Sequence, residues 1–244
     1  MNFDLLVHEA WPAYEQHVHE GWVLRYAGGV TKRANSVLAL TIPQDLDGAI
    51  GAAEAFYRER GQRCVFSMGS NSAPGLEDEL ARRGYGQVDS TIIMAGTPRL
   101  DSANGDGNGG GDRGGGSGVR IAERPWPGWL ETWWTVDGRF DSAVEVAERI
   151  CTGVPAWYAA YEEDGMALAV GRGVPQGDTL GIYCMATLPQ ARRRGLARKV
   201  LRALMRHGGT NSAYLVTTAP NQAAQALYRS EGFETAGRYH YRAL

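Results

Sequence analysis

The chain has 244 residues, 43% of them hydrophobic, and a formal net charge of −2 at pH 7. This length and hydrophobic content suit one large or two modest globular domains and exclude a chain that is disordered throughout. Because the net charge is slightly negative, no global positive field attracts nucleic acid or an anionic membrane surface, and we expect neither as a partner.

The N-terminal part, residues 1–100, predicts an alternation of strands and helices. Short apolar runs bounded by turn residues indicate strands, and longer segments with apolar residues three or four apart indicate helices. The expected strands cover residues 21–28, 34–40, 64–69 and 87–96, and the expected helices cover residues 47–61 and 75–85.

Residues 101–118, "DSANGDGNGGGDRGGGSG", contain almost nothing apolar to bury. Such a segment cannot offset its ordering entropy, so it predicts a flexible linker. A phosphate-binding glycine loop would need a strand before it and a helix after it, and a calcium-binding glycine–aspartate repeat would need several copies. Neither condition is met, and the linker divides the chain into lobes at residues 1–100 and 119–244.

The C-terminal lobe predicts two helices, three strands, and then helix, strand, helix and strand. Paired glycines at 208–209 and Gly232 are expected to end the two later helices. In chain order the helices cover 127–138 and 141–153, the strands 154–162, 165–174 and 177–188, and the last four elements 195–207, 213–218, 219–233 and 238–244.

Three consecutive arginines, residues 192–194, stand directly before the helix that begins at Gly195. Such a run is by itself most often a solvated basic turn. A helix N-terminus, however, offers unpaired N–H groups and the positive end of a dipole, which suit a pyrophosphate. Gly195 lets the backbone approach a ligand closely, and Ala197 has a small side chain. The pattern therefore favours an anion-binding loop.

The six residues "RRRGLA", placed between a strand and a helix, resemble the acetyl-CoA signature Q/R-x-x-G-x-G/A of the GCN5-related N-acetyltransferase (GNAT) superfamily. The resemblance covers the C-terminal lobe. It implies an α/β (α+β) fold whose lobes each have a mixed, mostly antiparallel sheet flanked by helices, with acetyl-CoA as co-substrate and no metal. The implied coenzyme contacts are Met185, Ala186 and Thr187 on the preceding strand, and Arg192, Arg193, Arg194, Gly195, Leu196 and Ala197 in the loop.

The segment "NQAAQALYRSEGF" resembles a second motif of the superfamily, N-x-x-A-x-x-L-Y followed by G-F. Asn221, Ala224 and Tyr228 are three, four and seven residues apart, so they share one face of a helix. The resemblance implies that Asn221 and Ala224 contact the coenzyme and that Tyr228 donates a proton to the departing thiolate. A phenol with a pKa near 10 is a plausible acid for a thiol with a pKa near 8.5. A core tyrosine is the alternative.

The acceptor side is less defined by the sequence. Trp133 and Trp134 could line an acceptor pocket, although core packing is the more common role of such residues. Four carboxylates lie in regions that border the acceptor cleft in the superfamily, and no general base is assigned among them: Glu131, Asp137, Glu162 and Glu163. His17 and His19 have no companion ligands, so no metal site is expected.

The N-terminal lobe repeats the pattern of the C-terminal lobe. The segment "TIPQDLDGAIGAAEAF" can be aligned with "TLPQARRRGLARKVL", and "NSAPGLEDELARRGY" with "NQAAQALYRSEGF". In this lobe Asp45, Leu46 and Asp47 replace the arginines, and no tyrosine follows Leu80. This resembles a tandem GNAT protein with a degenerate N-terminal half, although any chain that alternates strands and helices gives some such similarity.

The three cysteines, Cys64, Cys151 and Cys184, are widely spaced and form no C-x-x-C pattern, so reduced thiols are expected. The first residues lack the basic and apolar regions of a signal peptide. No apolar run approaches the roughly 20 residues that span a bilayer. We therefore expect a cytoplasmic protein.

The function expected from these features is direct transfer of an acetyl group from acetyl-CoA to a primary amine of a small molecule. One alternative acceptor is a protein lysine. An alternative of another class is a non-catalytic acyl-CoA sensor, against which the intact Tyr228 argues. The sequence leaves the acceptor, the general base and the oligomeric state open.

Overall fold

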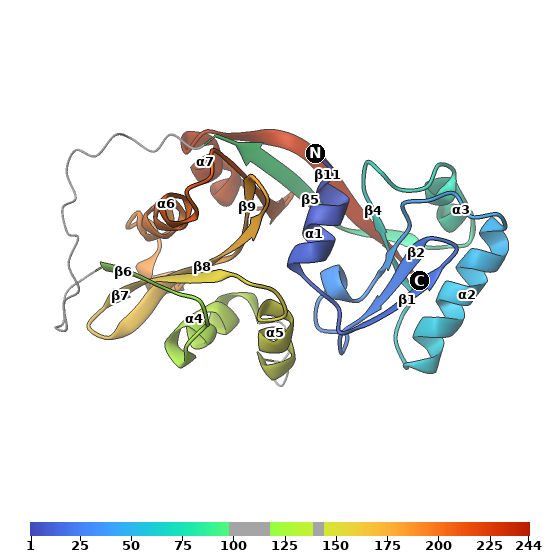
Figure 1. Ribbon diagram of the computed structural model, residues 1–244, viewed down its shortest axis with the longest axis horizontal. Helices are drawn as coiled ribbons and strands as arrows, with labels where there is room; N and C mark the ends of the chain where they lie inside the picture. The colour runs from blue at the N-terminus through green and yellow to red at the C-terminus, as the bar shows by residue number, and fades with distance from the viewer. Residues whose placement is uncertain (98–117, 139–143) are drawn as a thin grey trace.

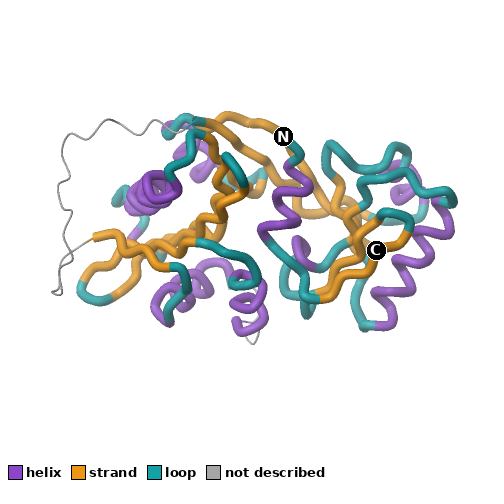
Figure 2. Tube along the Cα trace, viewed as in Figure 1, coloured by secondary structure: helices purple, strands orange, loops and turns teal. Residues whose placement is uncertain are grey.

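The structure is a computed structural model and describes residues 1–97, 118–138 and 144–244. One sheet runs through the whole of this part of the chain (Figure 1), and Figure 2 shows the strands crossing from one half of the molecule to the other. Over the described residues it has eleven strands in the order β1-β2-β3-β4-β11-β5-β10-β9-β8-β7-β6. The strands are β1 (Glu15–His19), β2 (Trp22–Tyr26), β3 (Val37–Leu38), β4 (Val65–Met68), β5 (Gly86–Gly96), β6 (Gly118–Ala122), β7 (Trp157–Glu163), β8 (Met166–Gln176), β9 (Thr179–Thr187), β10 (Ser212–Thr218) and β11 (Phe233–Ala243).

Helices cover both faces of this sheet. In the C-terminal half, α6 and α7 lie on one side of the strands and α4 and α5 on the other (Figure 1). The α-helices are α1 (Phe3–Ala10), α2 (Leu46–Glu59), α3 (Leu76–Arg82), α4 (Pro127–Asp137), α5 (Val144–Cys151), α6 (Leu196–Gly208) and α7 (Gln222–Ser230), and the short 3-10 helices are η1 (Lys32–Ala34) and η2 (Pro189–Ala191).

The sheet is mixed and mostly antiparallel, which confirms the predicted fold class. Two pairs of neighbours are parallel, β3 with β4 and β9 with β10. Each parallel pair is joined through a helix, α2 in the N-terminal half and α6 in the C-terminal half, because parallel neighbours need a crossover connection. The two halves share one sheet, whereas the sequence predicts one sheet in each lobe.

The two halves share one sheet because each half contributes its final strand to the other half. Strand β5, the last of the N-terminal half, lies between β10 and β11, and β11, the last of the C-terminal half, lies between β5 and β4. Both strands are eleven residues long, so each forms an extended ladder with strands of the other half. The predicted division into residues 1–100 and 119–244 stays a prediction, but the halves are bonded along these two strands.

Helix α6 shows why the local predictions succeed. Its buried residues share one face and pack on the sheet: Leu196, Val200, Leu201, Leu204 and Met205. The helix starts after Gly195, at φ 77°, and ends before Gly209, at φ 60°, both in the left-handed region that glycine adopts freely. The predicted helix 195–207 is therefore confirmed to within a residue.

Besides the two short 3-10 helices, three elements of the described residues are missing from the prediction: α1, β1 and β6. Strand β1 is the outermost strand of the sheet and most of its side chains are exposed, and β6 is the edge strand at the other end. Edge strands and a short helix with only Val7 and Ala10 buried carry weak apolar patterns. The linker predicted at 101–118 lies outside the described residues except for Gly118, which begins β6.

Candidate active site

Strands β9 and β10 are parallel neighbours that separate partway along their length. Their ladder ends at Ile182 and Leu215, although the strands continue to Thr187 and Thr218. Just beyond this point β9 changes register against β8, and Cys184 has φ 53°, as expected for a β-bulge. Since a bulge bends the strand that carries it, the two strands part and leave an opening between them.

A cavity of about 470 Å³ lies at this opening. It is lined by the separating ends of both strands, by α7, by α4, and by segments of the N-terminal half. This volume is in the range of pockets that bind small molecules. Because the cavity reaches from α7 to α4, it connects the two faces of the sheet at the point where the strands part.

Tyr228 lines this cavity from α7 and its side chain is almost fully buried. Within the described part of the chain no group hydrogen-bonds its hydroxyl, and its ring packs edge-on against Phe233. Burial raises the pKa of Tyr228 to about 12, because the charged phenolate would lose its hydration. The phenol is therefore protonated at neutral pH and can donate a hydrogen bond or a proton into the cavity.

Asn221 and Ala224 line the same cavity as Tyr228, as their shared helix face predicts. Asn221 is the N-cap of α7, and its side-chain oxygen accepts a hydrogen bond of 3.2 Å from the Ala224 N–H. That cap fixes the first turn of the helix. The structure thus brings the three residues of the second motif together on one wall.

The N-terminus of α6 has the form expected of an anion-binding loop. Gly195 and Arg193 both have positive φ, 77° and 61°, and the first i→i−4 bond of the helix runs from the Lys199 N–H to the Gly195 carbonyl. The N–H groups of the preceding turn have no intrahelical acceptor. A Cβ added at Gly195 would meet no atom within 4 Å, so the outer side of this turn is open.

The three arginines of the loop differ in their surroundings. Arg194 forms an ion pair with Glu163 at 2.7 Å, and Arg192 donates to the Thr187 carbonyl at 3.3 Å. Arg193 has no side-chain partner among the described residues. All three are exposed, so the pairs of Arg194 and Arg192 are weak and exchangeable. Their predicted contact with a pyrophosphate stays a prediction.

The remaining predicted coenzyme contacts divide into side chains and backbone. Met185 lines the cavity with its side chain. Ala186 and Leu196 are buried in the core, so only their backbone groups can meet a ligand. Thr187 and Ala197 are half-buried. These roles also stay predictions.

A buried carboxylate holds α6 in place beside α7. Glu231, which follows α7 and is 4% exposed, accepts hydrogen bonds of 2.6 Å from Arg198 Nε and 2.7 Å from Arg202 Nε. Both arginines are on α6. These two ion pairs join α6 to the end of α7, and so they hold the loop before α6 in place relative to Tyr228.

Trp133 and Trp134 both line the cavity from α4. Trp133 is also a core residue, 2% exposed and packed against Trp129 and Trp11. Trp133 therefore lines the cavity and also packs in the core, and its contact with an acceptor stays a prediction. Trp134 is half-buried.

Among the four carboxylates that border the predicted cleft, Asp137 is the one that lines the cavity. Glu162 accepts a hydrogen bond of 3.0 Å from the Trp126 indole, and Glu163 is paired with Arg194. Glu131 is exposed on α4.

The sequence prediction missed the contribution of the N-terminal half to this cavity. Residues 29–33, Trp11 and Asp89 all line it, and the Trp11 ring packs against Trp133 of α4. Asp89 is in β5, the exchanged strand, and forms an ion pair of 2.6 Å with Lys32. No local signal in these segments points to a site, because only the exchange of strands brings them there.

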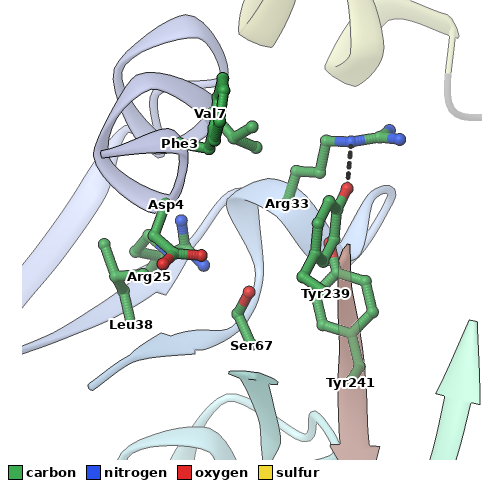
Figure 3. A pocket seen from close by; sticks show the side chains of 9 residues that line it. All are labelled: Phe3, Asp4, Val7, Arg25, Arg33, Leu38, Ser67, Tyr239 and Tyr241. Carbon is green, nitrogen blue, oxygen red and sulfur yellow. Dashed lines mark hydrogen bonds between the residues drawn. The ribbon is translucent and has the colours of Figure 1, made fainter. Parts of the chain in front are cut away.

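The N-terminal half has a small counterpart of this cavity, shown in Figure 3. It lies where the parallel strands β3 and β4 end, beside Leu38 and Ser67, and its volume is about 10 Å³. Phe3 and Val7 of α1 and the buried Arg25 fill the space that is open in the other half. A volume of this size holds about one water molecule.

Charge also distinguishes the two halves. At the N-terminus of α2, Asp45 is the N-cap residue and Asp47 is in the first turn, where it pairs with Arg83. The carboxylate of Asp45 lies against Gly48, since a Cβ there would be 2.5 Å from its oxygen. This helix end is occupied by the protein's own anions.

No three histidine, cysteine, aspartate or glutamate side chains in the described residues form a group that could hold a metal ion. None of the helices in residues 1–97, 118–138 and 144–244 combines the length and apolar character needed to cross a membrane.

Comparison with protein families places residues 6–242 in one family model, described as "Probable histone acetyltransferase Rv0428c C-terminal". The chain is also 26% identical over 239 residues to the uncharacterized N-acetyltransferase YobR of Bacillus subtilis (strain 168). That match covers 96% of this chain and 94% of YobR.

Solved structures give the same fold. A GCN5-related N-acetyltransferase from Kribbella flavida superposes with a TM-score of 0.65 at 17% identity, covering 95% of this chain and 89% of that one. A tandem GNAT protein from the clavulanic acid biosynthesis pathway superposes with a TM-score of 0.62 at 13% identity, covering 100% and 87%. Both likenesses extend over the two halves of the chain.

Proposed function

The chain belongs to the family described as probable histone acetyltransferase Rv0428c C-terminal, and from this premise we propose that it transfers the acetyl group of acetyl-CoA to a primary amine of a small molecule. The protein is an acyltransferase of the GNAT superfamily. The acceptor, the use of acetyl-CoA and a cytoplasmic location are parts of the proposal.

The observation that carries this proposal is the parting of β9 and β10 at a cavity that contains Tyr228. Beyond Ile182 and Leu215 the facing edges of the strands no longer pair with each other. Free strand edges offer N–H and C=O groups to an extended ligand, and the pantetheine arm of coenzyme A is extended and carries two amides. The open N-terminus of α6 then takes the pyrophosphate.

In this arrangement the chemistry is a direct displacement. The neutral amine attacks the thioester carbonyl, the new C–N bond forms, and the C–S bond breaks. The electron pair leaves with the sulfur, and Tyr228 donates its proton to that thiolate. As the amide forms, the attacking nitrogen loses one proton to water or a carboxylate, and a proton from water restores the Tyr228 hydroxyl, so that one proton in total passes from nitrogen to sulfur.

Walls on both sides of the cavity favour a small acceptor over a protein lysine. The N-terminal half closes the α4 side with residues 29–33 and with Trp11, so an acceptor enters a confined space. The family description names a histone acetyltransferase, which supports protein lysine as the second candidate acceptor. A lysine side chain on a flexible tail would have to reach in between the two halves.

An acceptor screen tests the proposal. Purified protein with acetyl-CoA is incubated with amino acids, aminoglycosides, polyamines and lysine-containing peptides, and free thiol is measured over a no-acceptor blank. We expect thiol release that depends on a small amine and a product heavier by one acetyl group. Release with lysine peptides alone would favour the second candidate, and binding of acetyl-CoA with no release in any class would contradict both.

A further inference from the structure

Arg33 enters the cavity from a part of the chain that the coenzyme motifs do not include. It lies in η1, directly after the loop that follows β2. Asn35 fixes this loop, because its side-chain oxygen accepts from the N–H groups of Ala27 and Gly29 at 2.7 and 2.8 Å, and its amide donates to the Thr31 carbonyl at 2.8 Å. Arg33 therefore projects from a rigid support.

The guanidinium of Arg33 is held on one side only. Its Nε donates to the Tyr239 hydroxyl at 3.2 Å, and its Cζ lies 5.5 Å from the centre of the Trp11 ring. Figure 3 shows the two terminal nitrogens directed away from Tyr239. Within the described residues no carboxylate forms an ion pair with Arg33, so these donors are unpaired there.

The charges around Arg33 leave it as an available cation. Its neighbour Lys32 is paired with Asp89 at 2.6 Å. Asp137, which lines the cavity from α4, is close enough to act electrostatically on Arg33 but does not form an ion pair with it. A planar guanidinium with free donors matches the two oxygens of a carboxylate.

The neighbouring aromatic residues are also rich in donors. The indole N–H groups of Trp11 and Trp133 are buried and have no hydrogen-bond partner among the described residues. Both residues line the cavity. Unpaired donors in partly desolvated surroundings favour a ligand that brings acceptor oxygens.

We propose that Arg33 binds a carboxylate of the acceptor, so that the acceptor is a small amine that also carries a carboxylate, as amino acids do. This inference rests on the proposed function and specifies its substrate class. Arg33 holds the acid end from the N-terminal half, and the amine lies toward Asp137 and the parted strands. Polyamines and aminoglycosides, which carry several cations and no carboxylate, are disfavoured by the same residue.

The test compares acceptors that differ only in the acid group. Amino acids with the amine at different distances from the carboxylate are each assayed beside their carboxamides, with wild type, Arg33→Ala and Arg33→Lys. We expect wild type to prefer the acid over the amide by about 10- to 100-fold in kcat/KM, as for hydrogen bonds to a charged group. Arg33→Ala should abolish that preference with the KM for acetyl-CoA kept within about twofold.

A second readout separates this inference from the proposed function. Trp11, Trp133 and Trp134 line the cavity, so binding of an acid or its amide can be followed by quenching of tryptophan fluorescence, with coenzyme A present and no turnover needed. If no amine is acetylated, the proposed function fails, while stronger quenching by acids that is lost in Arg33→Ala still supports the role of Arg33.

Matched variants guard against misfolding. Arg58→Ala, at an exposed position of α2, removes an arginine of the same half and should leave both readouts unchanged. If Arg33→Ala unfolds, Arg33→Lys decides, because lysine keeps the charge without the planar fork and should weaken the preference. Equal use of acids and amides by wild type, or an unchanged preference in a folded Arg33 variant, would overturn the inference.

Discussion

Replacing Tyr228 by phenylalanine removes one hydroxyl from the cavity and is the sharpest test of its role as acid. The ring should stay where it is, because it packs against Phe233 and is almost fully buried. The hydroxyl has no hydrogen-bond partner among the described residues. At neutral pH the variant should therefore unfold with a free energy within about 1 kcal/mol of wild type.

The effect on catalysis should be much larger than the effect on stability. General acid catalysis contributes factors of about 100 to 10,000, and water in the cavity can replace part of it. We expect kcat to fall by about 10- to 1000-fold, which is about 1.4 to 4 kcal/mol of transition-state stabilisation. The KM for acetyl-CoA should change little, since the proton is transferred only as sulfur departs.

The assay is free thiol release at saturating acetyl-CoA, with circular dichroism and a melting curve as checks of folding. A folded Tyr228→Phe variant with wild-type kcat would refute the role of this residue as the acid. A variant whose KM for acetyl-CoA rises while kcat is constant would instead assign Tyr228 to ground-state binding.

The pKa of Tyr228 adds a prediction with a definite sign. The folded pKa of about 12 lies above the ordinary value of 10, so the contribution of the neutral phenol to stability is complete below pH 10 and is lost as pH rises toward 12. At pH 11 wild type should have lost about 1.4 kcal/mol relative to Tyr228→Phe, compared with their difference at pH 8. Urea denaturation at the two pH values measures this, and a constant difference would contradict the burial argument.

The other predictions concern the coenzyme loop, the degenerate half and an acidic transition. Gly195→Glu should weaken acetyl-CoA binding, measured by calorimetry, by about 100-fold or more, because it places bulk and negative charge at the open N-terminus of α6. Gly209→Glu, which changes a glycine with equally positive φ at the other end of the helix, should leave the affinity unchanged. Similar losses in both variants would refute the role of this loop in binding acetyl-CoA. Calorimetry of wild type should give one acetyl-CoA per chain, since the counterpart cavity of the N-terminal half is filled and the N-terminus of α2 carries Asp45 and Asp47. A stoichiometry of two would refute the interpretation of the N-terminal half as degenerate. Burial and the nearby Arg25 lower the pKa of His8 to about 4. The stability that the neutral imidazole contributes above the ordinary pKa of 6.5 should therefore be lost as pH falls toward 4. His8→Gln should flatten this part of the curve of unfolding free energy against pH, and an unchanged slope would contradict the burial of His8.

The sequence by itself determined the local geometry of the side of the cavity that is proposed to bind the coenzyme. The start of α6 at Gly195 and the shared face of Asn221, Ala224 and Tyr228 follow from helix geometry, in which each hydrogen bond joins residues four apart. The Asn221 cap and the glycine after each helix act over the same short range. Such features can be predicted because everything that stabilises them lies within a few positions along the chain.

The tertiary structure alone decided the side of the cavity that is proposed to bind the acceptor. Arg33, Asp89 and Trp11 reach the cavity only because β5 and β11 change places between the halves and join them into one sheet. A strand pairs through backbone N–H and C=O groups that are the same in every residue, so an apolar run shows that a strand exists without showing which strand it pairs with. The choice between partner strands depends on packing between residues more than a hundred positions apart in the chain. This choice places Arg33, from the first half of the chain, near Asp137 of the second.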